Sequence, residues 1–117
     1  MNLTIITFPE NNYFHEIAEE IKEKNLIFYA SDAADKMAFE SQEELQAAVK
    51  RAMELCIAQG YSVSSNFRRI FKSSPLGIIF DWKLSALAYN LVRLNGDPSN
   101  PLVAHLQISL LKNFFNT

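Results

Sequence analysis

The chain has 117 residues, a formal net charge of −2, 49% hydrophobic residues and one cysteine. This length suits a single domain with its own core, and the hydrophobic content argues against general disorder. No apolar run reaches the roughly 18–20 residues of a membrane-spanning helix, so we expect no membrane partner. The acidic balance argues against broad nonspecific DNA binding, which requires an excess of Lys and Arg.

The single cysteine and the N-terminal residues indicate the cellular compartment in which we expect the protein. Cys56 has no second cysteine with which to form an internal disulfide. The opening MNLTIITFPE lacks the basic region and the long apolar stretch of a signal peptide. We therefore expect a cytoplasmic protein in a reducing environment.

The N-terminal part predicts a strand, a helix and a second strand. Residues 3–8 are rich in β-branched side chains, and Pro9 ends the run. Residues 13–24 place apolar side chains at helical spacing, and residues 26–29 read as a short buried strand. Residues 1–27 are a candidate addition to the rest of the domain.

Two helices are predicted next. Ser31 is a suitable N-cap for a short helix over residues 32–38. Ser41 and Glu44 form a capping box for a long helix over residues 42–59. The apolar face of the long helix is expected to contain Leu45, Ala48, Val49, Ala52, Met53 and Cys56.

Residues 67–83 predict a β-hairpin. Its arms are residues 67–72 and 77–83, and residues 73–76 join them. Because side chains alternate between the faces of a strand, one face of the second arm should carry Ile78, Phe80 and Trp82.

The C-terminal part predicts two helices joined by a tight turn. Ser85 is an N-cap, and Gly96 is expected to stop the first helix with a positive φ. Asn100 and Pro101 then provide an N-cap and a favourable first helical residue. The buried face of the first helix should comprise Leu84, Leu87, Ala88 and Leu91, with Tyr89 packed back on Leu84.

Together these elements predict one α+β domain over residues 1–117. We expect a small antiparallel sheet, including the β-hairpin, to pack against four or five helices, and the chain to end in an αα-hairpin.

A spaced set of residues runs through positions 28–115. It starts with FYA and SDAA at residues 28–34, and its most complete part surrounds NGDP at residues 95–98, with LS at 84–85, YNLV at 89–92, VA at 103–104 and Gln107. This ordered set resembles the bacterial DNA-damage-inducible protein D family. More distantly, it resembles the N-terminal domain shared by baculovirus-repeat proteins and phage antirepressors. The resemblance implies a non-enzymatic regulator that acts on DNA-bound proteins or on DNA.

A basic and aromatic cluster lies on the first arm of the predicted hairpin. Its cations alternate with apolar residues, so they could grip phosphates, or their long stems could cover apolar surface. Two cations of the long helix extend the cluster if that helix lies alongside. The predicted partner or nucleic-acid contacts are Arg68, Arg69, Lys72, Lys50 and Arg51.

Reactive residues are sparse. His15 and His105 lie far apart in the sequence, and Cys56 alone cannot complete a metal site with them. Ser31 and Asp32 have a structural explanation at a helix start, and no hydrolase, phosphate-binding or dinucleotide motif is present. We expect no catalytic residue, no cofactor and no metal.

The last predicted helix, residues 101–115, is apolar around most of its circumference. Such a helix is either central to the core or packed on a partner. The second interpretation predicts a homodimer or docking surface that includes Leu106, Leu110, Phe114 and Phe115. Our preferred function is a regulator that contacts a protein partner, with DNA binding by the basic hairpin as the alternative.

Overall fold

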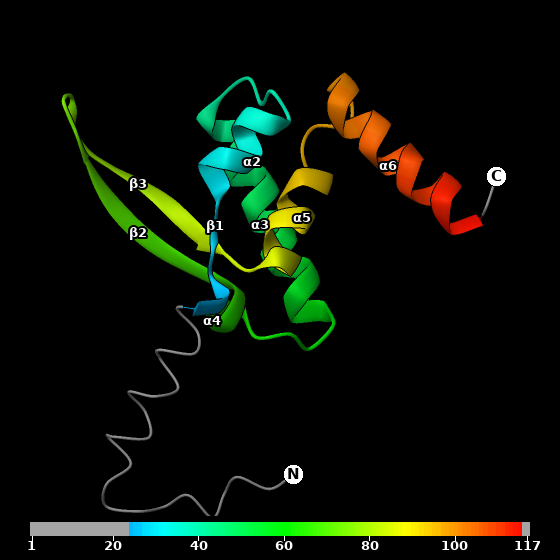
Figure 1. The fold of residues 1–117 in the computed structure, drawn as a ribbon, viewed down its shortest axis with the longest axis horizontal. Coiled ribbons are helices and arrows are strands. Elements are labelled where there is room, and N and C mark those ends of the chain that lie inside the picture. The colour runs from blue at the N-terminus through cyan, green and yellow to red at the C-terminus, as the bar shows by residue number, and fades with distance from the viewer. Residues whose placement is uncertain (1–23, 116–117) are drawn as a thin grey trace, which may run out of the picture.

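The computed structural model describes residues 24–115, in which one small sheet packs against helices (Figure 1). The sheet is antiparallel, with strand order β1-β3-β2, and the α+β class is confirmed. The strand at 3–8 and the helix at 13–24, apart from Lys24, lie outside the described residues. The elements are β1 (Phe28–Tyr29), α2 (Ala30–Lys36), α3 (Gln42–Ala58), α4 (Val63–Asn66), β2 (Phe67–Ser74), β3 (Gly77–Leu84), α5 (Ala86–Leu94) and α6 (Pro101–Phe115).

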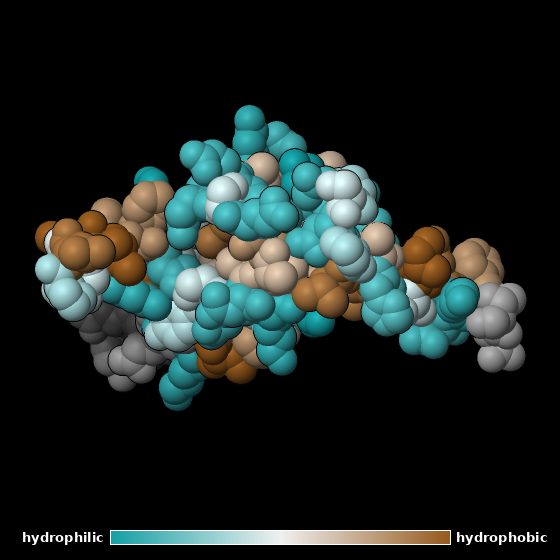
Figure 2. Space-filling model, turned by 90° about the horizontal axis from the view of Figure 1, so that it is seen from above, coloured by the Kyte–Doolittle hydropathy of each residue, from teal (hydrophilic) through white to brown (hydrophobic). Residues whose placement is uncertain are grey.

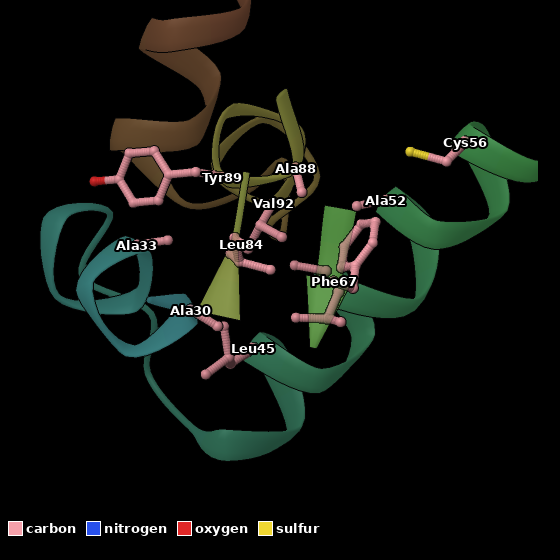
Figure 3. Packing of buried hydrophobic residues seen from close by; sticks show 12 residues of the cluster. Ala30, Ala33, Leu45, Ala52, Cys56, Phe67, Leu84, Ala88, Tyr89 and Val92 are labelled. Atoms are coloured by element: carbon pink, nitrogen blue, oxygen red, sulfur yellow. The ribbon is translucent and has the colours of Figure 1, made fainter. Parts of the chain in front are cut away.

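The hydrophobic core lies where α2, α3 and α5 meet the base of the β2–β3 hairpin (Figure 3). Leu84 is fully buried at the end of β3, and Ala88 and Val92 of α5 are buried beside it. The rings of Phe28 and Tyr89 stack with centroids 4.5 Å apart. The small side chains at the centre let helices and strands approach closely, so this core fixes the base of the hairpin.

Helix α3 confirms the sequence-based prediction closely. The Ser41 hydroxyl accepts a hydrogen bond from the Glu44 N–H at 3.1 Å. The Glu44 carboxylate accepts from the Glu40 N–H at 2.8 Å, one residue before the position in a standard capping box. Five of the six residues of the predicted face are buried: Leu45, Ala48, Val49, Ala52 and Cys56.

Helix α2 starts earlier than predicted. It begins at Ala30, after Tyr29 in an extended conformation, and no side chain caps it. Ser31 therefore lies inside the first turn, and its hydroxyl donates to the Asp81 carboxylate of β3. The prediction of Ser31 as an N-cap was wrong because a charged acceptor 50 residues away competes for its hydroxyl.

Helices α5 and α6 begin as predicted. The Ser85 hydroxyl accepts from the Ala88 N–H at 3.1 Å. The Asn100 side chain accepts from the Leu102 N–H at 2.9 Å, and Pro101 is the first helical residue. Leu87 was expected to be buried and is instead 41% exposed. The buried positions of α5 are Ala88, Tyr89 and Val92.

Gly96 has a role different from the predicted one. Its φ is not positive, unlike the φ of Gly60 and Gly77. A Cβ at Gly96 would lie 2.8 Å from Cζ of Phe39 and 2.8 Å from Cγ2 of Val103. Glycine is needed here because the α5–α6 turn packs directly against these two side chains.

The β2–β3 hairpin is slightly longer than predicted. Its register runs from Phe67 opposite Leu84 to Ser74 opposite Gly77, so only Pro75 and Leu76 form the turn. The hairpin projects away from the helices (Figure 1). In the described part of the chain, no helix has the length and apolar character needed to cross a membrane.

Candidate functional site

Asp81 holds the base of the hairpin against α2. Its carboxylate is 5% exposed and accepts four hydrogen bonds. The Ser31 N–H donates at 3.1 Å and the Ser31 hydroxyl at 2.5 Å. The Lys72 ammonium donates at 3.0 Å and the Trp82 N–H at 2.7 Å. One carboxylate thus connects β2, β3 and α2.

These hydrogen bonds determine the charge of Asp81. Burial disfavours the ionised form and raises the pKa of this carboxyl. The donors from Ser31, Lys72 and Trp82 outweigh that effect, so the pKa of Asp81 lies below its usual value. Asp81 is therefore a carboxylate near neutral pH, and it neutralises Lys72.

The outer half of the hairpin carries a concentrated apolar surface, which we name the tip surface: Phe71, Leu76, Ile78, Ile79 and Phe80. Leu76 in the turn is 99% exposed, and Ile78 is 76% exposed. Figure 2 shows hydrophobic side chains gathered at the end of the molecule where the hairpin lies. From the turn back to the pair Phe71–Phe80, the only charged residue is Lys72.

The predicted cations take several different positions. The Arg69 guanidinium lies 4.2 Å from the Phe80 ring centroid, so it covers one edge of the tip surface. Lys72 pairs with Asp81 and lies 4.4 Å from the ring of Tyr29. Arg68 stands opposite Lys83 in the hairpin register.

The two cations of α3 are arranged differently. The Arg51 guanidinium donates to the Asn95 carbonyl in the α5–α6 turn, with Nε at 3.0 Å. Lys50 is exposed. Arg51 therefore supports the α5–α6 turn and is not part of a basic surface on the hairpin.

A groove of about 460 Å³ lies between the hairpin and α3. Ile78, Ile79 and Phe80 form one side of the groove, so it continues the tip surface. Its polar groups are the amides of Gln42 and Gln46 from α3 and the side chains of the Ser31, Lys72 and Asp81 cluster. An apolar groove with a few polar side chains is a common form of peptide and protein contact site.

Helix α6 forms a second apolar surface. Only Val103 of this helix is buried, and the Gln107 amide donates to the Leu94 carbonyl at 2.7 Å. Beyond that contact α6 leaves the rest of the fold (Figure 1). Of the predicted oligomer residues, Leu106 is half-buried, and Leu110, Phe114 and Phe115 are 46%, 80% and 64% exposed. Core packing thus describes only the first turns of α6.

A smaller apolar groove lies between α5 and the C-terminal end of α3 with the residues that follow it. It has a volume of about 180 Å³, and the sequence did not predict it because its residues come from segments far apart in the chain. Its lining residues are Leu55, Cys56, Gln59, Tyr61, Leu87 and Leu91.

The candidate metal ligands and the single thiol have the following places in the described residues. Within residues 24–115, no three His, Cys, Asp or Glu side chains are grouped as metal ligands. Burial raises the pKa of the Cys56 thiol, which keeps it protonated. His105 lies 3.4 Å from the Ser109 hydroxyl on the same helix, and His15 falls outside the described residues.

Comparison with known proteins adds no relative. No protein-family model, curated protein or solved structure matches the chain.

Proposed function

We propose that this chain is a non-enzymatic regulatory module that acts by protein–protein contact. The circuit would be of the damage-response or phage type that the sequence resemblance implies. The observation that carries the proposal is the tip surface, in which five large apolar side chains project on a two-stranded ribbon. Binding of a partner there would act by occlusion, because a bound hairpin covers the partner's own contact surface.

The size of the tip surface supports a protein contact. With about 200–240 Å² for a fully exposed Leu, Ile or Phe, it presents roughly 700 Å² of apolar residue surface. Each side of a standard protein–protein interface buries about 800 Å². A projecting two-stranded ribbon also gains little stability by itself, so a partner that covers it would stabilise it further.

The charges indicate the chemistry of the partner. Arg69 lies beside the tip surface, and Arg68 and Lys83 are further back on the same hairpin. An apolar cleft bordered by carboxylates would complement this arrangement. A DNA-bound protein with such a cleft fits the proposed circuit.

DNA itself is the second candidate partner. The hairpin carries four cations, Arg68, Arg69, Lys72 and Lys83, against the single carboxylate of Asp81. Two observations favour protein over DNA. The outermost residues, 73–77, where a ribbon would enter a groove, carry no charge, and Lys72 is neutralised by Asp81.

A mobility assay separates the two candidates. We expect the protein to cause no shift of single- or double-stranded DNA at low or moderate salt, and the variant Arg68→Glu/Arg69→Glu to behave identically. Contacts with phosphate weaken steeply as salt rises. Salt-sensitive binding that this double variant abolishes would overturn the protein-contact proposal in favour of DNA.

A further inference from the structure

The αα-hairpin of α5 and α6 is open. Residues 95–100 form a short connection, and short connections usually place two helices side by side and antiparallel. Here the Gln107 amide donates a hydrogen bond to the Leu94 carbonyl at the end of α5. The second half of α6, Ile108–Phe115, extends away from α5 (Figure 1).

The α3–α5 groove lies where a closed hairpin would place that second half. Leu87 belongs to the first turn of α5, which an antiparallel helix would reach last, and Leu91 lies one turn nearer the α5–α6 connection. Leu55 is 44% exposed and Tyr61 57%, and no residue of α6 lines the groove. The chain thus leaves a helix and a groove of matching apolar character without contact with each other.

The α5–α6 turn is held by contacts with α3 and with the residues that follow α2. The Asn100 amide donates to the Met37 carbonyl at 2.8 Å, and the Asp97 N–H donates to Glu44 at 3.2 Å. Arg51 binds the Asn95 carbonyl from α3, and Gly96 is packed against Phe39. These contacts fix the direction in which α6 leaves the turn.

We propose that Ile108–Phe115 of one copy packs into the α3–α5 groove of a second copy, and that the exchange is reciprocal about a two-fold axis. Such an exchange of an identical element is a low-cost route to a dimer. One contact would thus cover two exposed apolar surfaces of the chain, the second half of α6 and the α3–α5 groove. The groove lining contains no Lys, Arg, Asp or Glu, and Lys112 is the only such residue of α6. The exchange would therefore bury no carboxylate.

The area agrees with a stable dimer. From the exposed fractions, the groove presents roughly 300 Å² of apolar residue surface, and one face of α6 beyond Gln107 presents a similar area. A reciprocal exchange has two such contacts and would bury roughly 1,200 Å², at the lower end of the ~1,200–2,000 Å² of stable standard interfaces. Neither surface alone reaches this size.

Sedimentation of the full chain tests the exchange. We expect a dimer at micromolar concentration, and we expect Leu111→Gln on α6 and Leu87→Gln in the groove each to raise its dissociation constant roughly tenfold or more. Ile57→Gln is the matched control, because Ile57 is 65% exposed on α3 and lies outside the groove lining. This control should leave the dimer unchanged, and far-UV circular dichroism confirms that each variant folds.

Disulfide trapping identifies which copy occupies the groove. In a Cys56→Ala background, chains with Leu87→Cys are mixed with differently tagged chains with Leu111→Cys, and we expect a covalent link between the two. Three results would each overturn the exchange. The wild type could be monomeric, or the dimer could be insensitive to Leu87→Gln. A chain that carries both Leu87→Cys and Leu111→Cys could form the disulfide within itself. None of these results affects the tip surface, whose partner contact is measured separately.

Discussion

Asp81→Ala is expected to lower the free energy of unfolding by about 3 kcal/mol, because several partly buried donors lose their acceptor at once. The Ser31 hydroxyl and the backbone N–H groups of Ser31 and Trp82 would all need new partners. Lys72 loses less, since its side chain is 40% exposed and water can solvate it. Urea denaturation at neutral pH measures the effect, and a loss below about 0.5 kcal/mol would contradict it.

The pH dependence provides a control for Asp81. Since the folded pKa of Asp81 lies below its unfolded value, ionised Asp81 stabilises the fold above the unfolded pKa of about 3.9. That stabilisation should be lost as pH falls through the folded pKa. In Asp81→Asn, the free energy of unfolding should fall less over this acidic range than in the wild type. In Lys72→Ala, it should fall almost as much as in the wild type, because the Ser31 and Trp82 donors still lower the pKa of Asp81.

Gly96→Ala is expected to cost about 2–3 kcal/mol, since an added methyl group overpacks a closed site. Its Cβ would collide with the Phe39 ring and with Val103, and its φ already suits any residue. Thermal or urea denaturation measures this loss. Gly60→Ala is the contrasting variant, because no atom lies within 4 Å of an added Cβ there. Any loss of stability at Gly60 would come from its φ of +80° and not from a collision.

A second substitution tests the stated reason for Gly96. Phe39→Leu should recover part of the stability in the Gly96→Ala background, because a smaller side chain removes part of the collision. If the two losses simply added, the collision with Phe39 would not be the cause. A loss at Gly96 no larger than at Gly60 would also contradict the packing argument.

Local chemistry made much of the fold predictable. The caps at Ser41, Ser85 and Asn100 depend on residues two or three positions away, and all three form. The β-hairpin also follows from alternation and turn residues close in sequence. These features need no knowledge of distant contacts.

The predictions that were wrong depend on contacts between distant residues. Ser31 binds Asp81 instead of capping its helix, and Gly96 is required by Phe39 rather than by its own φ. The pairing of Lys72 with Asp81 requires the hairpin register, and the α3–α5 groove requires the relative position of two helices. The basic hairpin was therefore recognisable from the sequence, but its neutralised lysine and apolar tip surface were not.

Photo-cross-linking from position 76 most directly tests the claim that the tip surface binds a protein. With a photoreactive residue at Leu76 in the cells that produce the chain, we expect one protein to be trapped that is not trapped from the control position Ile57. The purified partner should bind Leu76→Ser/Ile78→Ser at least tenfold more weakly than wild type. Cross-links to nucleic acid alone, identical products from both positions, or unchanged affinity of the double variant would contradict the account.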